Sequence, residues 1–189
     1  MRSYPVSALV SIAAAAALTA CGSMSPPMAS SMPAPYSQAA VPAAVQVPAG
    51  HKVALETVGV GEITYECQAK ADAPGGHAWV FVGPKADLNS RAGVKLGSYY
   101  GPPATWASTD GSRITGKQLA LAPGAAGSIP MQLVQANPAE GSGAMNGVTY
   151  VQRVATRGGV APSLACAAAS MGRKEIVKYQ ADYIFWKAA

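Results

Sequence analysis

The strongest constraint on the fold is a period-two alternation of apolar and polar residues. In residues 62–68 the side chains of Ile63, Tyr65 and Cys67 share one face and polar side chains take the other, the pattern of a half-buried β-strand. Residues 175–186 alternate in the same way. Because no window of about a dozen residues keeps a helical period, the sequence predicts an all-β fold.

Glycine- and proline-rich turns separate the other expected strands. Asp110-Gly111 predicts a hairpin, because both residues tolerate a positive φ. Further strands are predicted at residues 77–82, 105–108, 113–115, 128–135 and 148–155, and the alanines of residues 165–169 favour one helical turn. A spacing of about ten residues between strands is typical of sandwiches and barrels. We therefore predict a single antiparallel β-sandwich, with a jelly-roll-like or barrel-like arrangement as the alternative.

The N-terminal part of the chain predicts export and lipid anchoring. An apolar run behind Arg2 is shorter than the roughly 20 residues needed to span a bilayer, as in a cleaved export signal. It ends at Leu18-Thr19-Ala20-Cys21, which resembles the lipobox of bacterial lipoproteins. We expect residues 1–20 to be a signal peptide and Cys21 to carry acyl chains. Gly22, where an aspartate is associated with inner-membrane retention, favours the outer membrane, facing the periplasm.

Residues 21–47 are expected to form a tether and residues 48–189 one domain. The tether lacks charged residues and is rich in proline, alanine and serine, a composition that favours extended chain over a core. The formal charge of +5 is scattered along the chain, unlike the clustered charge of a nucleic-acid-binding face. The expected partners are the membrane, through the anchor, and an envelope polysaccharide or protein; no nucleic acid is expected.

The cysteines of the domain, Cys67 and Cys166, form an even pair. In an oxidising compartment such a pair predicts one structural disulfide, worth about 4–5 kcal/mol in the chain-entropy model for a loop of about 100 residues. A redox-active or metal-binding pair is the alternative. The chain has no CxxC spacing and only His51 and His77 as histidines, so we predict no metal site and no cofactor.

Signatures of hydrolytic enzymes are absent from the sequence. It contains neither a GxSxG nor an HExxH motif, and we predict no catalytic residue. Nine aspartates and glutamates are present, and a glycosidase needs only two suitably spaced carboxylates. The sequence therefore favours a non-catalytic binding or structural module of the envelope, and a carboxylate-dependent hydrolase acting on envelope polysaccharide is the alternative.

Five residues are candidates for ligand binding. Tyr99, Tyr100, Trp106 and Asp110 combine aromatic surface with a carboxylate beside glycine and proline, as in domains that hold sugars or peptides. In the alternative interpretation Tyr99 and Trp106 are core residues and Asp110 caps its own turn. Arg153 is either an anion clamp or one half of a structural ion pair with Asp182 or Glu66.

Several spaced motifs together resemble the DUF3455 family of bacterial and fungal secreted proteins. They include Tyr65-x-Cys67, Trp79-Val80-Phe81-x-Gly83-Pro84, Tyr99-Tyr100-Gly101-Pro102 and the run from Val148 to Cys166. The resemblance implies one compact exported domain with paired cysteines, and it implies no activity. The chain departs from the family pattern at Ser98, where histidine is usual, and at Met131, where tryptophan is usual.

Overall fold

The computed structural model describes residues 35–189, and the predicted lipidation site Cys21 lies outside them. Pro35–Ala189 forms one compact unit. Its strands are β1 (His51–Ala69), β2 (His77–Asn89), β3 (Lys95–Tyr100), β4 (Thr105–Ser108), β5 (Arg113–Ala122), β6 (Met131–Ala136), β7 (Val148–Gly158) and β8 (Lys174–Ala188). Three short 3₁₀ turns complete the secondary structure: η1 (Ala43–Val45), η2 (Pro74–Gly76) and η3 (Ala168–Ser170). None of the helices described is long and apolar enough to cross a membrane.

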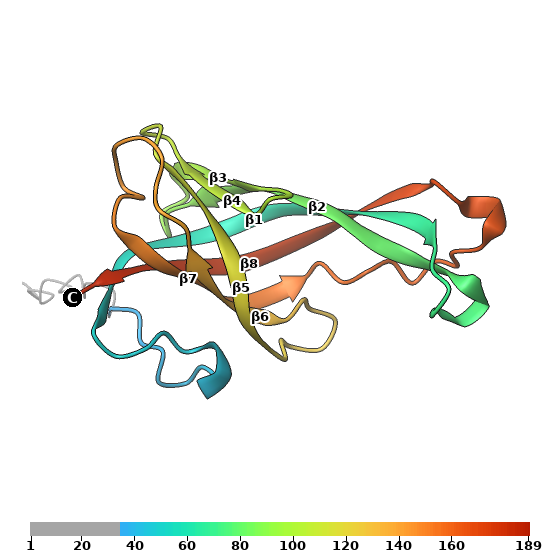
Figure 1. Ribbon diagram of the computed structural model, residues 1–189, viewed down its shortest axis with the longest axis horizontal. Coiled ribbons are helices and arrows are strands. Elements are labelled where there is room, and N and C mark those ends of the chain that lie inside the picture. The colour runs from blue at the N-terminus through green and yellow to red at the C-terminus, as the bar shows by residue number, and fades with distance from the viewer. Residues whose placement is uncertain (1–34) are drawn as a thin grey trace, which may run out of the picture. The chain divides into compact units, whose positions relative to one another are not determined.

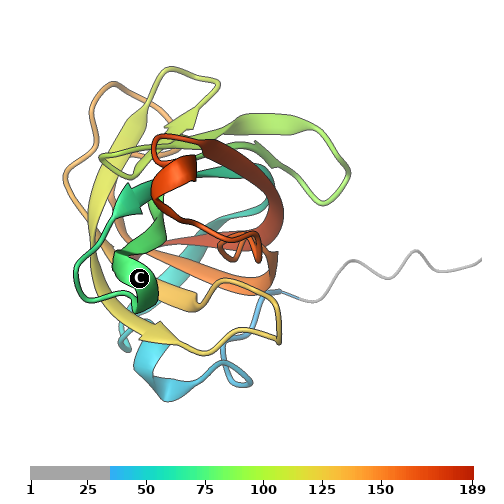
Figure 2. The ribbon, with the colours of Figure 1, turned by 90° about the vertical axis from the view of Figure 1, so that its right-hand side faces the viewer.

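The eight strands form one closed antiparallel barrel in chain order (Figures 1 and 2). Closure comes from the pairing of the first strand with the last, which extends from His51↔Ala188 to Glu66↔Lys174. The all-β class, the antiparallel pairing and the Cys67–Cys166 disulfide are confirmed. The barrel-like alternative is the arrangement observed, rather than two stacked sheets, because β1 and β8 meet along almost their full length.

Strands β1, β2 and β8 are the longest and extend beyond the others, toward the right of Figure 1. The β1–β2 connection lies at their far end, together with the segment that precedes β8. The disulfide joins the end of β1 to that segment. The single predicted helical turn near residues 165–169 is η3, in the same segment.

The barrel interior holds the larger hydrophobic cluster. Its buried members include Leu88 on β2, Tyr99 on β3, Trp106 on β4 and Phe185 on β8. Gly59 on β1 leaves the space that the ring of Tyr183 occupies, since a Cβ at Gly59 would lie 2.5 Å from a ring carbon. The inward alternation predicted from the sequence is thus the alternation that builds this core.

A second cluster lies on the outer face of the barrel, beneath the segment that precedes β1. Val45 and Val47 of this segment are buried against residues of β5–β8, including Leu133, Val154 and Ile184. The amide of Gln152 donates to the Val45 carbonyl at 2.7 Å. Residues 36–47 were expected to belong to the tether, but they pack on the barrel. The apolar contact comes from the three valines of the segment and from Tyr36.

The strand predictions omitted β3 and the first half of β1. Both contain inward-facing glycines, Gly97 on β3 and Gly59 and Gly61 on β1, that interrupt the apolar pattern. Added Cβ atoms at these positions would collide with neighbouring strands or with Tyr183. The glycines therefore permit close approach inside a tightly closed barrel, although they weaken the sequence signal for a strand.

Candidate binding site

The predicted aromatic segment divides between the two faces of the sheet. Tyr99 and Trp106, from adjacent strands, are 6% and 1% exposed, and their rings stack with centroids 4.9 Å apart. Tyr100 has the opposite orientation and is 42% exposed. The structure thus brings Tyr99 and Trp106 together in the core and separates Tyr100 from them.

Asp110 organises its own turn. Its carboxylate accepts hydrogen bonds from the hydroxyl and backbone N–H of Ser112, at 2.6 and 2.9 Å. It also accepts the backbone N–H of Ala144 at 2.7 Å, which attaches the loop before β7. These bonds, the one from the Ser112 hydroxyl first, hold the pKa of Asp110 well below its usual range. The turn-capping interpretation of Asp110 is therefore confirmed.

Arg153 lies on β7 and makes no ion pair with either expected partner. Its Nε and Nη2 both donate to the Pro130 carbonyl, at 3.2 and 3.0 Å. Asp182 instead pairs with Arg91 at 2.9 Å, and Glu66 pairs with Lys174 at 3.7 Å. The predicted ion pairs are wrong because β7 alternation turns Arg153 inward with Val151, whereas Asp182 points to the outer face with Ile184.

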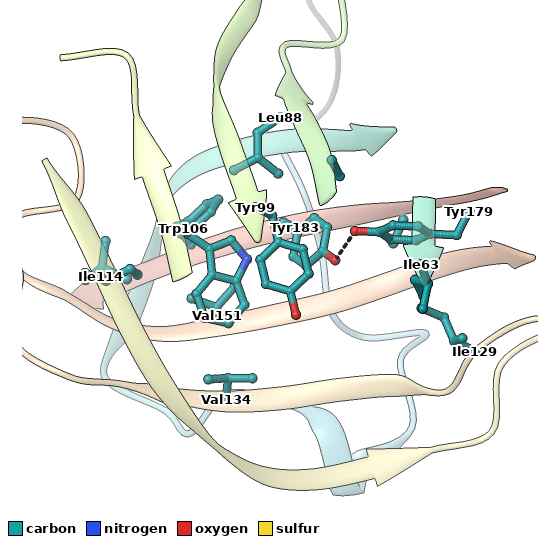
Figure 3. Packing of buried hydrophobic residues seen from close by; sticks show 14 of the residues in the cluster. Ile63, Leu88, Tyr99, Trp106, Ile114, Ile129, Val134, Val151, Tyr179 and Tyr183 are labelled. Atoms are coloured by element: carbon teal, nitrogen blue, oxygen red, sulfur yellow. Dashed lines mark hydrogen bonds between the residues drawn. The ribbon is translucent and has the colours of Figure 1, made fainter. Parts of the chain in front are cut away.

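Four tyrosines contribute hydroxyl groups to the barrel interior. Tyr65 from β1, Tyr179 and Tyr183 from β8, and Tyr99 are each no more than 9% exposed. The Tyr179 and Tyr183 hydroxyls lie 3.1 Å apart (Figure 3). The Tyr65 hydroxyl donates to the Gly159 carbonyl at 2.8 Å. We refer to these four residues together with Arg153 as the tyrosine–arginine cluster.

The positive charge of Arg153 affects the pKa of all four tyrosines. Burial raises the pKa of Tyr65, Tyr99, Tyr179 and Tyr183, most strongly for Tyr183, and the positive charge of Arg153 opposes that rise in each case. Tyrosine hydroxyls are protonated at neutral pH even with an ordinary pKa, and the raised pKa values move ionisation further from it. The hydroxyls are therefore able both to donate and to accept hydrogen bonds.

The cluster has hydrogen-bonding capacity that the protein does not use. Within residues 35–189, no carboxylate lies within ion-pair distance of Arg153. A guanidinium has five N–H donors. Arg153 uses only its Nε and Nη2, and both donate to the same carbonyl oxygen of Pro130. The buried indole N–H of the neighbouring Trp106 also lacks a partner in this part of the chain. An anionic or hydroxyl-bearing group matches the unused donors of the half-buried Arg153 guanidinium.

The nine carboxylates all engage other groups of the protein. Eight belong to ion pairs, and Asp110 accepts the three hydrogen bonds described above. Glu56 and Asp182 are the closest to a paired arrangement, since both bind Nη2 of Arg91. Among the described residues, no three His, Cys, Asp or Glu side chains gather as they would to hold a metal ion.

Sequence reasoning missed Tyr65, Tyr179 and Tyr183 as site residues. The alternation had placed all three on inward faces, but it could not show that β1 and β8 are neighbours. Ser98, where the family resemblance implied histidine, lies in register with Asp87 of β2 and alternates with Tyr99, away from the cluster. The substitution there leaves the tyrosine–arginine cluster unaltered.

Comparison with known proteins identifies one family. The family model described as "Protein of unknown function (DUF3455)" matches residues 48–187, a range that includes β1–β7, all of β8 except its last residue, and both cysteines of the disulfide. No curated protein and no solved structure matches the chain.

Proposed function

The chain belongs to the DUF3455 family of unknown function, and from its own residues we propose that it is a non-catalytic binding module of the bacterial envelope. In this proposal residues 1–20 are a signal peptide and lipid on Cys21 anchors the protein to the outer membrane, facing the periplasm. The ligand is an anionic or hydroxyl-rich component of the envelope, such as a polysaccharide or a protein segment.

The observation that carries this proposal is the uncompensated guanidinium of Arg153 beside the tyrosine hydroxyls. Arg153 is half-buried, so its guanidinium loses only part of its hydration, and a carboxylate partner would normally offset that cost. Arg153 has only the Pro130 carbonyl. An anionic ligand group would supply the missing charge, and the planar guanidinium would orient it through paired hydrogen bonds.

The hydroxyls of the cluster suit recognition better than catalysis. Burial raises the pKa of Tyr179 and Tyr183, so these groups do not ionise readily to act as bases. Because Tyr179 and Tyr183 are almost completely buried, they form a neutral wall behind Arg153, and the guanidinium is the group that contacts the ligand. The cluster thus supports binding without bond cleavage.

The substitution Arg153→Gln tests the site. Full chain in zwitterionic nanodiscs is incubated with peptidoglycan, with purified envelope polysaccharide and with periplasmic extract, and retention is measured. We expect at least a tenfold loss of retention for R153Q, because the substitution removes a charge-assisted hydrogen bond worth about 1.5–3 kcal/mol. The control is Arg113→Gln, which removes an arginine whose ion pair with Glu140 is exposed. Equal retention of wild type, R153Q and R113Q would refute this site.

The substitution Cys21→Ala tests the anchor separately. We expect it to abolish fatty-acid labelling and to leave unprocessed precursor, because the thioether needs the cysteine sulfur. The control is Cys67→Ala, which removes a cysteine outside the lipobox and should be labelled normally. Undiminished labelling of the C21A variant would exclude lipidation at this residue.

The second candidate function is a carboxylate-dependent hydrolase. Its supporting observation is that Glu56 and Asp182 bind the same guanidinium nitrogen of Arg91, which places two carboxylates near each other on the outer face. Release of soluble fragments from peptidoglycan by the wild type, and its loss in Glu56→Gln, would favour this function over simple binding.

A further inference from the structure

A depression of about 670 Å³ lies on the outer face of the sheet, across β7, β8 and β1. Its lining is made by Val60, Gly61, Arg157, Gly158, Lys178, Tyr179 and Gln180. A smaller depression of about 240 Å³ adjoins it through Val60 and Gly61, toward β2. Val60, Lys178 and Gln180 alternate with the inward-facing residues of their strands. Tyr179, a nearly buried member of the tyrosine–arginine cluster, also borders the depression, so the two sites meet at this residue of β8.

An irregularity in β7 places Arg157 at this depression. Between the pairs Val154↔Asp182 and Arg157↔Gln180, β7 has one residue more than β8, the hallmark of a β-bulge. Ala155, in the bulge, has a φ of 48°, the only positive value of a non-glycine residue in the described part of the chain. Such a backbone is uncommon outside glycine. The bulge turns Arg157 to the side of the sheet that carries Gln180.

Of the two positively charged side chains in the lining, Lys178 has a carboxylate partner and Arg157 has none within residues 35–189. The Nζ of Lys178 lies 3.0 Å from the Glu62 carboxylate, so much of its charge is compensated. Arg157 is exposed, and no carboxylate in residues 35–189 lies within ion-pair distance of it. Its guanidinium thus supplies the free positive charge of the depression, and the Gln180 amide adds a hydrogen-bonding group.

The lining also includes apolar surface that the fold does not use. Val60 is 49% exposed, and Gly61, whose missing side chain would point inward, contributes backbone to the lining. Arrangements of this kind, an apolar surface with a few convergent polar groups, are typical of small-molecule sites.

We propose that this depression binds a ligand in which an apolar body carries one anionic group, a phosphate or a carboxylate. The guanidinium of Arg157 holds the anionic group through paired hydrogen bonds. The apolar body lies on Val60 and the backbone of Gly61. The site does not include Arg153, and it shares only Tyr179 with the tyrosine–arginine cluster.

Phenyl phosphate and benzoate are suitable probes because each joins one apolar ring to one anionic group. Their binding to full chain in zwitterionic nanodiscs is measured by isothermal titration, with empty nanodiscs as the blank. Phenol and inorganic phosphate, the two halves of the first probe, serve as reference ligands. We expect saturable binding of phenyl phosphate, benzoate or both, at least tenfold tighter than that of either half. Failure of both intact probes to bind more tightly than the halves would overturn the proposal.

Two variants locate the binding. Arg157→Met keeps the length of the side chain but removes its charge, and Val60→Ser removes the apolar surface; each should weaken probe binding at least fivefold. The control is Lys117→Met, because Lys117 is an exposed cation on β5, outside this lining. Unchanged binding in the R157M and V60S variants, or an equal loss in K117M, would overturn the assignment.

Two further comparisons identify the source of the anion and separate the two sites. Nanodiscs that contain phosphatidylglycerol should weaken probe binding by competition if a lipid headgroup is the natural ligand, and should leave it unchanged if a soluble molecule is. Arg153→Gln should leave probe binding unchanged whether or not it affects retention on envelope material. If R153Q loses probe binding while R157M binds the probe as the wild type does, the result would contradict a site on the outer face.

Discussion

Adjacent residues Tyr99 and Tyr100 have opposite roles because a β-strand turns successive side chains to opposite faces. Tyr99 is buried between Trp106 and Tyr183, with ring centroids at 4.9 and 5.1 Å. Tyr100 is 42% exposed. The same residue type therefore contributes to the core at one position and to the surface at the next.

Alanine substitution distinguishes the two tyrosines. We expect Tyr99→Ala to lower the free energy of unfolding by about 3–5 kcal/mol, as for other buried aromatic side chains. We expect Tyr100→Ala to change it by less than about 1 kcal/mol, because a partly exposed side chain leaves no closed cavity. Urea denaturation of both variants measures the difference. Equal destabilisation would contradict the orientation of β3.

Among the elements, the segment before β1 depends on very few side chains. Val45 is fully buried and Val47 nearly so, while Gln38 bonds the backbone N–H and carbonyl of Val47 at 2.8 and 2.9 Å. Tyr36 packs edge-on against Trp186 and donates to Gln152 at 2.9 Å. These contacts attach residues 36–47 to the outer face, although the segment belongs to no strand.

Val45→Asp should detach this segment and leave the barrel folded. An aspartate at this position would bury a carboxylate without a partner, at a cost of several kcal/mol. The adjacent Ala44 is exposed, so Ala44→Asp is the matched control. We expect hydrogen exchange in residues 36–47 to accelerate at least tenfold in V45D and to stay near the wild-type rate in A44D. Exchange that rises across β1–β8 as well would show that the segment is part of the barrel core.

At the scale of the whole molecule, two long-range links hold the ends of the domain together. The β1–β8 pairing joins the first strand to the last, and the disulfide joins residues 99 positions apart in the chain. The disulfide lies toward the far end of the long strands, while the pairing continues to the C-terminus. We therefore expect the barrel to retain its strand pairing when the disulfide is removed.

Replacing both cysteines with alanine should destabilise the fold without abolishing it. A cross-link around a loop of this length restricts the unfolded chain by up to about 4–5 kcal/mol. We expect a fall in unfolding free energy of that order at most, measured by denaturation, with the β-sheet circular dichroism retained in water. Reducing agent should destabilise the wild type by a similar amount and leave the variant unchanged. A variant as stable as the oxidised wild type would contradict a stabilising role.

Local residue patterns were sufficient to predict the all-β class, the positions of most strands, the disulfide and the turn at Asp110. Each of these follows from short-range alternation, turn chemistry or cysteine count. The inward direction of Tyr65, Tyr179 and Tyr183 was also readable, because alternation assigns a face to every strand residue. Where glycines face inward, as in β3 and early β1, the pattern disappears and the strands were missed.

Only the tertiary structure decided which strands are neighbours, and therefore which side chains meet. Closure through β1 and β8 brings Tyr65, Tyr179 and Tyr183 together with Tyr99 and Arg153, from four different strands. The β7–β8 register pairs Arg153 with Tyr183, so that the adjacent Asp182 lies on the other face and the predicted ion pair does not form. The physical reason is that alternation assigns each residue to a face without naming its partner, and strand order is set by long-range pairing that leaves no local mark in the sequence.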